Sequence, residues 1–191
     1  LINGTNFIDG LNGLVLSYYL TIVLIVFKLG LFEYSFLNNL DVYIIMIVLI
    51  YLILFNLFNQ LYIGDSGSYL IGFITGYFLI QIYENGPLFS PYFIALLLWY
   101  PAFEILFSII RKIKFKKSPF NPDNKHLHHL LFLCINKKYK LSNNFSNNLC
   151  SLIIILYNIL IFYIATFNIY YTSLHISLFI FNIVVYLALY F

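Results

Sequence analysis

The stretch Arg111–Lys140, RKIKFKKSPFNPDNKHLHHLLFLCINKKYK, decides how the chain is organised. Nine of the chain's 10 Lys and Arg residues lie in it, and so do three of its 4 His residues. The sequence on both sides is strongly apolar. Basic segments between hydrophobic stretches stay on the cytoplasmic side of a membrane. The stretch therefore predicts a membrane protein with a cytoplasmic loop over residues 111–148.

The composition supports a membrane location. The 191 residues are 62% hydrophobic and 9% charged, whereas soluble domains carry about 25% charged residues. A chain of this size cannot hide so much apolar surface in a water-soluble core. The formal net charge of +3 is concentrated in one segment, which favours membrane topology and anionic partners over nucleic acid. We expect one all-α membrane domain over residues 1–191.

Six apolar stretches predict about six membrane-spanning helices, since each residue of a helix advances about 1.5 Å through a hydrocarbon core of about 30 Å. They cover residues 11–32, 42–58, 68–83, 92–110, 149–167 and 173–191. Pro101 predicts a kink in the fourth stretch. Gly72 and Gly76 form a small-residue face, which predicts close packing against another helix.

Counting these spans places three polar motifs on one membrane face. Two crossings separate Asp9 from Asp65, and two more separate Asp65 from His126. All three motifs are therefore predicted to lie on the face of the basic loop. The connections on the opposite face carry Glu33, Asp41 and Glu84 in the same count.

The two Asp–Gly motifs each have a structural and a functional interpretation. Residues 3–13, NGTNFIDGLNG, predict a turn in which Asp9 caps the next helix, yet a glycine-rich helix start also admits a phosphate or nucleotide. If the segment is helical, Asn3, Asn6 and Asp9 share one side. Asp65, or Ser66 beside it, could cap a helix, but Asp65 also suits Mg²⁺, which binds one or two carboxylates plus phosphates and water.

The histidine cluster allows three interpretations. It comprises a lysine and three imidazoles: Lys125, His126, His128 and His129. The ligand set is thin for zinc, and a plain interfacial loop is the second alternative. An anion site is favoured, because the lysine and the imidazoles offer donors to a diphosphate. Three residues before the cluster are expected to stiffen the chain and start a helix there: Pro119, Pro122 and Asp123.

Glu104 is an ionisable residue inside a predicted span, and such a residue marks a functional site by default. It lies about two turns from the predicted cytoplasmic end. We favour an interfacial carboxylate, or a pair with Lys or Arg, over a catalytic role.

In chain order, the stretches NGTNFIDGLNGL, LYIGDSGSYLIG and SPFNPDNKHLHHLL resemble the polyprenyl-phosphate sugar-1-phosphate transferases of glycosyltransferase family 4. This superfamily includes the phospho-MurNAc-pentapeptide transferase and the undecaprenyl-phosphate GlcNAc-1-phosphate transferase. The resemblance covers residues 1 to about 135. The H-x-H-H pattern at His126 is similar to the GlcNAc-1-phosphate branch.

The resemblance implies transfer of a sugar-1-phosphate, with GlcNAc-1-phosphate expected, from a UDP-sugar to undecaprenyl or another polyprenyl phosphate, with release of UMP. It implies Mg²⁺, or Mn²⁺, at Asp65, and catalysis by Asp9 and Asp65. The substrate would contact a further set: Asn3, Asn6, His126, His128 and His129; Lys125 is added to it on charge alone. The implied setting is the cytoplasmic face of a bacterial inner membrane, where cell-envelope glycans such as lipopolysaccharide begin. A homodimer is left open.

One departure affects the expected activity. The family has an Asp–Asp pair in an earlier cytoplasmic loop, and this sequence contains no adjacent Asp pair. The sequence is therefore expected to be a C-terminal portion without transferase activity by itself. The alternatives are an inactive or split-enzyme scaffold derived from the family, and a transporter fragment that uses Glu104.

Overall fold

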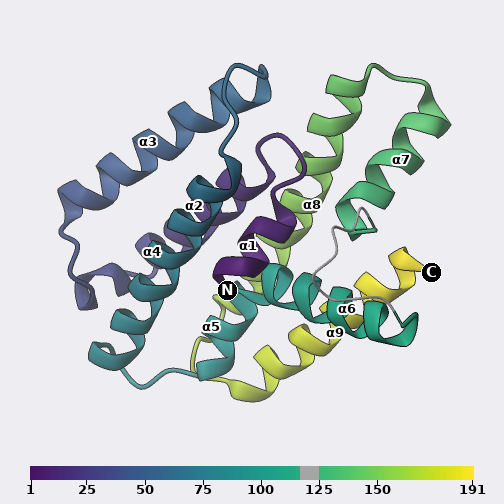
Figure 1. Cartoon of the computed structure of the whole chain (residues 1–191). Coiled ribbons are helices and arrows are strands. Elements are labelled where there is room, and N and C mark those ends of the chain that lie inside the picture. Colours follow the sequence, from purple (N-terminus) through teal and green to yellow (C-terminus); the bar gives the residue numbers. More distant parts are fainter. Residues whose placement is uncertain (117–124) are drawn as a thin grey trace.

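The computed structural model describes residues 1–116 and 125–191, and the regular elements in these ranges are all helical (Figure 1). Three of the predicted loop residues, Pro119, Pro122 and Asp123, lie outside the described residues. In chain order the elements are α1 (Ile2–Ile8), α2 (Leu14–Lys28), η1 (Leu31–Tyr34), α3 (Asn39–Leu57), α4 (Gly64–Asn85), α5 (Pro91–Leu97), α6 (Trp99–Lys114), α7 (Leu127–Tyr139), α8 (Asn143–Ala165) and α9 (Thr172–Tyr190). The prediction of an all-α fold is confirmed.

The predicted spans correspond in order to these helices, but not all of them are long and apolar enough to cross a membrane. Among the described residues, α3, α8 and α9 meet both conditions, and the bent pair α5–α6 meets them if it counts as one span. The apolar helix α2 has 15 residues and is shorter than a full span. The structure therefore supports three to four spans, and the count of six stays a prediction.

Helix α2 lies in the core of the bundle. Its apolar side chains are buried on most sides, with Leu14, Tyr18 and Ile22 all fully buried. The outer helices α3 and α9 instead expose many large apolar side chains, as expected for surfaces that face lipid. A fully apolar helix of this kind belongs inside a bundle, which explains why a short helix can occupy the centre.

The fourth predicted span is broken. Helices α5 and α6 meet at an angle of 72° around Leu98. Pro101 has no backbone N–H, so the carbonyl of Leu97, four residues earlier, loses its helical donor. The hydroxyl of Tyr18 in α2 donates a hydrogen bond of 2.8 Å to that carbonyl. The predicted kink is therefore confirmed, and a buried tyrosine supplies the hydrogen bond that proline cannot.

Helix α1 is wedged between α4 and α6, and small residues permit the close approach. A Cβ atom added at Gly72 would lie 2.6 Å from Oγ1 of Thr5, and one added at Gly76 would lie 3.0 Å from Leu1. On the other side, a Cβ atom at Gly4 would overlap the backbone carbonyl of Pro101. The small-residue face predicted on residues 68–83 is thus used, and its partner is α1.

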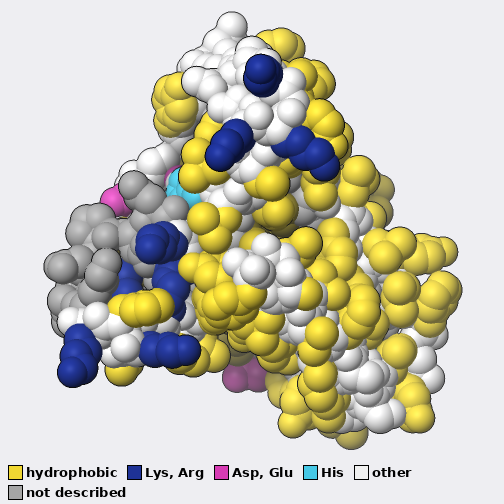
Figure 2. All heavy atoms as spheres, turned by 90° about the vertical axis from the view of Figure 1, so that its right-hand side faces the viewer, with side chains coloured by type: hydrophobic (Ala, Val, Ile, Leu, Met, Phe, Trp, Pro, Cys, Tyr) yellow, Lys and Arg dark blue, Asp and Glu magenta, His cyan; other side chains and the backbone are white. Residues whose placement is uncertain are grey.

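The predicted cytoplasmic loop over residues 111–148 is partly helical. Its first residues continue α6 to Lys114, a separate helix α7 occupies Leu127–Tyr139, and α8 begins at Asn143. Figure 2 shows the face of the molecule that lies on the right in Figure 1. Basic side chains gather at one end and along one side of that face, while apolar side chains cover most of the remainder. Basic and lipid-compatible surfaces are therefore separated, as in proteins that sit across a membrane boundary.

Candidate functional site

Asp9 lies directly after α1 and not at the start of α2. The residue is the C-cap of α1, and Gly13, with φ of 73°, precedes the first residue of α2. The predicted N-cap role of Asp9 is therefore wrong, and so is the predicted turn over the helical residues of α1. The alternative helical interpretation was closer, because Asn3 and Asn6 lie on α1 and Asp9 ends it.

Asp65 lies in the first turn of α4 and is exposed. Helix α4 begins at Gly64 after the N-cap Ile63, and no side chain caps it. The predicted capping roles of Asp65 and Ser66 are therefore wrong. The carboxylate of Asp65 is left exposed at a helix N-terminus, where the helix dipole favours negative charge.

A short chain of hydrogen bonds joins α1 to the start of α4. The side-chain amide of Asn6 donates 3.2 Å to the hydroxyl of Tyr69, and the hydroxyl of Ser68 donates 3.1 Å to Oδ1 of Asn6. The same Ser68 hydroxyl lies 3.0 Å from the backbone carbonyl of Asp65. These contacts fix the first two sequence motifs against each other.

Asp9 and Asp65 are close enough to interact electrostatically. Burial, and secondly the charge of Asp65, raise the pKa of Asp9 from 3.8 to about 6. Like charges disfavour each other's ionised form, so this pair would gain from a bound cation. Two carboxylates also match Mg²⁺, which usually completes its shell with phosphate and water oxygens. Residues Asp9 and Asp65 therefore fit a magnesium–diphosphate complex by charge and ligand type.

The three imidazoles of the His cluster lie side by side at the start of α7. His126 is the N-cap residue of α7, so a helix does begin at the cluster as predicted. The rings of His126 and His128 are stacked 5.6 Å apart, and those of His128 and His129 are 4.3 Å apart. Within the described residues no group of three His, Cys, Asp or Glu side chains is arranged to hold a metal ion.

Gly10 brings the first motif into contact with the His cluster. A Cβ atom added at Gly10 would lie 2.6 Å from Nε2 of His128 and 2.6 Å from Cε1 of His129. Only a residue without a side chain permits this approach. His128 is fully buried, and burial, followed by the neighbouring His129 and His126, lowers its pKa well below 6.5. His128 is therefore neutral at physiological pH.

Two further contacts surround the cluster on the side of α1 and α6. The ring of Phe7 meets the ring of His126 edge to face, with centroids 5.1 Å apart. The ammonium group of Lys112 lies 6.0 Å from the centre of the Phe7 ring. Lys112 is buried and adds positive charge beside the site. Lys112 is not among the candidate residues of the sequence analysis.

The side chains of two other predicted site residues, Asn3 and Lys125, are exposed. Asn3 is exposed near the start of α1, and no hydrogen bond between it and the other candidates is found in the described residues. The side chain of Lys125 is exposed, whereas its backbone carbonyl accepts hydrogen bonds from Arg111 and Tyr190. The structure therefore brings together Asn6, Asp9, Asp65 and the three imidazoles.

The sequence does not reveal a network of asparagine side chains behind Asp9, because no local pattern links these distant residues. Asn12 donates its backbone N–H to Asn147 at 2.7 Å and its side-chain amide to Asn59 at 2.5 Å. The backbone N–H of Gly13 donates to Asn56. Asparagines at the end of α3 and the start of α8 thus hold the segment that follows Asp9, next to a cavity of about 240 Å³.

Comparison with known proteins agrees with these motifs. Residues 1–83 match the model of glycosyl transferase family 4. The predicted resemblance to this family of membrane transferases is therefore confirmed.

The curated relatives carry more specific names. An undecaprenyl-phosphate alpha-N-acetylglucosaminyl 1-phosphate transferase of Thermotoga maritima is 33% identical over 78 residues, 41% of this chain and 25% of the relative. A probable undecaprenyl-phosphate N-acetylglucosaminyl 1-phosphate transferase of Bacillus subtilis is 32% identical over 137 residues, 68% of this chain and 37% of the relative. A decaprenyl-phosphate N-acetylglucosaminephosphotransferase of Mycolicibacterium smegmatis is 29% identical over 154 residues, 69% of this chain and 37% of the relative.

The chain thus spans less than two-fifths of the length of these curated relatives. No solved structure matches it.

Proposed function

We propose that this chain forms the part of a polyprenyl-phosphate sugar-1-phosphate transferase that holds the nucleotide-sugar diphosphate. The observation that supports the proposal most strongly is the meeting of three motifs from distant parts of the sequence. Asp9 lies beside Asp65 of the second motif, and Gly10 lies against His128 and His129 of the third. Carboxylates for a metal ion and imidazoles for an anion therefore occur in one place.

The names of the relatives and the chemistry of these residues support the following reaction. An oxygen of the polyprenyl phosphate attacks the β-phosphorus of a UDP-sugar, with GlcNAc as the expected sugar. The new P–O bond forms as the bond to UMP breaks, and UMP leaves. Mg²⁺ bound at the site would neutralise charge on the diphosphate and the leaving group.

The protein groups then have separate roles in this proposal. Asp65, exposed at the start of α4, would be the principal metal ligand, and Asp9 would stand next to it. The imidazoles of His126 and His129, with Lys125, would contact the diphosphate. The neutral, buried ring of His128 would pack against the other two imidazole rings. The whole site would face the cytoplasm of a bacterial inner membrane, as the positive charge of the adjoining segments favours.

The test replaces Asp65 by Asn in the full-length protein in native membranes. We expect UMP release that depends on UDP-sugar, polyprenyl phosphate and Mg²⁺ to fall at least about 100-fold, because removing charge stabilisation at a transition state costs about 10²–10³-fold. Asp41→Asn is the matched control, because it makes the same chemical change at a different place. Asp41 lies near the start of α3, about 24 Å along the helix from Leu57 at its end.

Two results would count against this function. If Asp65→Asn and Asp41→Asn release UMP equally well, the carboxylate of Asp65 has no catalytic part. If neither Mg²⁺ nor UDP-sugar raises the unfolding temperature of the wild-type protein, the site binds neither ligand, because a ligand of the folded state must stabilise it. Both results together would favour a non-catalytic scaffold.

A further inference from the structure

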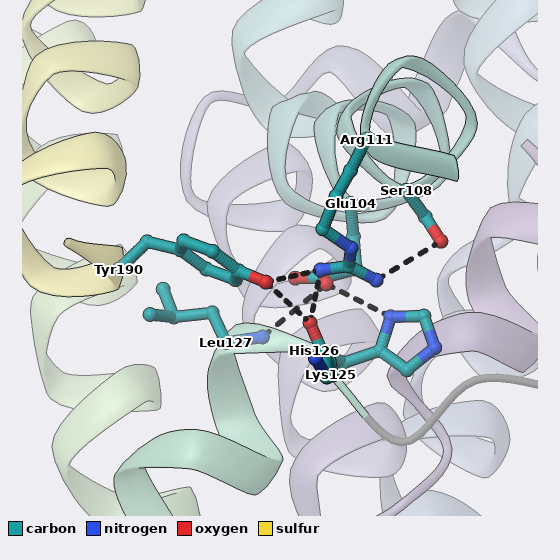
Figure 3. A network of polar contacts seen from close by, with 7 residues as sticks. All are labelled: Glu104, Ser108, Arg111, Lys125, His126, Leu127 and Tyr190. Atoms are coloured by element: carbon teal, nitrogen blue, oxygen red, sulfur yellow. Dashed lines mark hydrogen bonds and ion pairs between the residues drawn. The ribbon is translucent and has the colours of Figure 1, made fainter. Parts of the chain in front are cut away.

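Glu104 is a fully buried carboxylate that contacts the His segment at two points (Figure 3). Its Oε1 atom lies 2.9 Å from Nδ1 of His126 and accepts a hydrogen bond of 3.3 Å from the backbone N–H of Leu127. Its other oxygen, Oε2, is buried. The sequence favours an interfacial carboxylate or a pair with Lys or Arg for Glu104, whereas the structure buries its side chain against a histidine.

The chemistry of this pair restricts the histidine. Burying a carboxylate in a membrane protein is costly, so such a group is usually paired and functional. An ionised carboxylate can only accept hydrogen bonds. Nδ1 of His126 must then carry the proton, which leaves Nε2 as the ring atom that can face a ligand. A hydrogen bond at one ring nitrogen sets the state of the other in this way.

The backbone around His126 is held from both directions. Arg111, seven residues after Glu104, lies on the same side of α6 and donates to the backbone carbonyl of Lys125. Arg111 also donates 2.5 Å to the hydroxyl of Tyr190 in α9, and that hydroxyl lies 3.3 Å from the same carbonyl. The peptide groups before and after His126 are therefore both fixed.

The ring of His126 is also confined. The edge-to-face contact with Phe7 on α1 limits it on one side, and the stacked ring of His128 limits it on another. His126 is only 5% exposed. Phe7 lies two residues before Asp9, so the ring of His126 is confined by the helix whose C-cap residue is Asp9.

We propose that Glu104 is a positioning residue that accepts the Nδ1 proton of His126 and so holds the ring with its Nε2 atom toward the diphosphate of the substrate. When Nε2 also carries a proton, it can donate a hydrogen bond to a phosphate oxygen, because both ring nitrogens of an imidazolium are donors. This inference rests on the proposed function. Glu104 itself touches no reacting group and acts through the imidazole. Outer partners of this kind, in metal sites where they have been measured, contribute about 10- to 100-fold to activity or affinity.

Kinetics of Glu104→Gln in the full-length protein provide the first test. We expect kcat for UMP release to fall about 10- to 100-fold while KM for the UDP-sugar changes much less, because the contact with the diphosphate strengthens as negative charge builds up on the leaving UMP. Glu84→Gln, the same change on an exposed carboxylate near the end of α4, is the matched control and should leave kcat unchanged.

A spectroscopic measurement on the wild-type protein keeps the proposal testable even if Glu104→Gln does not fold. Nitrogen-15 NMR of ring-labelled histidine distinguishes the two tautomers, and the His126→Gln variant identifies the His126 signals by their loss. We expect a protonated Nδ1. A His126 ring protonated only at Nε2, or an unchanged kcat in Glu104→Gln, would overturn the inference. If Asp65→Asn is fully active, the proposed function itself has failed instead.

Discussion

Replacing Asp9 by Asn should stabilise the folded protein while it removes activity. The folded state raises the pKa of Asp9 to about 6, chiefly through burial and then through Asp65. A raised carboxyl pKa means that the folded state binds the proton more tightly than the unfolded state does. The resulting stability is present below pH 3.8 and is lost as the pH rises through 6. At pH 7.5 the ionised Asp9 is therefore a cost, which a neutral amide avoids.

The size of this effect follows from the pKa change. A rise from 3.8 to about 6 corresponds to an upper limit of about 3 kcal/mol, at about 1.4 kcal/mol for each pKa unit. Because the side chain keeps some contact with water, screening reduces the effect to about 1–2 kcal/mol. The assay is thermal unfolding in detergent without divalent cations, measured from pH 4 to pH 8. We expect the wild-type protein to lose stability relative to Asp9→Asn between pH 4 and pH 6, and to stay lower above pH 7.

Magnesium provides a further check on this reasoning. If Mg²⁺ binds beside the two carboxylates, it should stabilise the wild-type protein more than Asp9→Asn and reduce the difference between them. Asp41→Asn, far along α3, should show no gain at pH 7.5. An Asp9→Asn protein that is less stable than the wild type at pH 7.5 without Mg²⁺ would refute the electrostatic argument.

Three other substitutions test the packing around the site. Gly10→Ala should lower activity and cost about 1–3 kcal/mol of stability, typical of overpacking, because its Cβ atom would lie 2.6 Å from the buried His128; activity and unfolding measurements with a wild-type-like result would contradict the close approach. Tyr18→Phe leaves the Leu97 carbonyl without the donor described above, and thermal unfolding should show a loss of about 1–3 kcal/mol. Gly72→Val should separate α1 from α4 and reduce both the unfolding temperature and UMP release, and a stable, active variant would argue against the wedge.

Much of the fold followed from hydrophobic patterning alone. The apolar stretches gave the order of the helices, and Gly72 and Pro101 correctly indicated a close contact and a bend. The exact boundaries did not follow. Residues 3–9 look like a turn because asparagine, glycine and aspartate favour turns. The packing of α1 against both α4 and α6 overrides that local preference and makes the segment helical.

The candidate site was predictable as a set of residues but not as a geometry. Counting spans placed Asp9, Asp65 and His126 on one face, and the structure brings the corresponding motifs into contact. The pairing of Glu104 with His126 could not be read from the sequence, since the two are 22 residues apart and no local pattern relates them. The asparagine network behind Asp9 also depends on contacts between helices that no local pattern reveals.

The hydrogen bond from the hydroxyl of Tyr190 can form only late in the synthesis of this protein. It reaches the carbonyl of Lys125 across 65 residues of sequence. At a synthesis rate of about 5–20 residues per second, a ribosome needs about 3–13 s to add those residues. During that interval the histidine segment lacks its hydrogen bond from Tyr190. Proteases and quality-control factors at the membrane would therefore meet an unfinished site, and a chain that stalls before α9 would insert its helices without ever completing it.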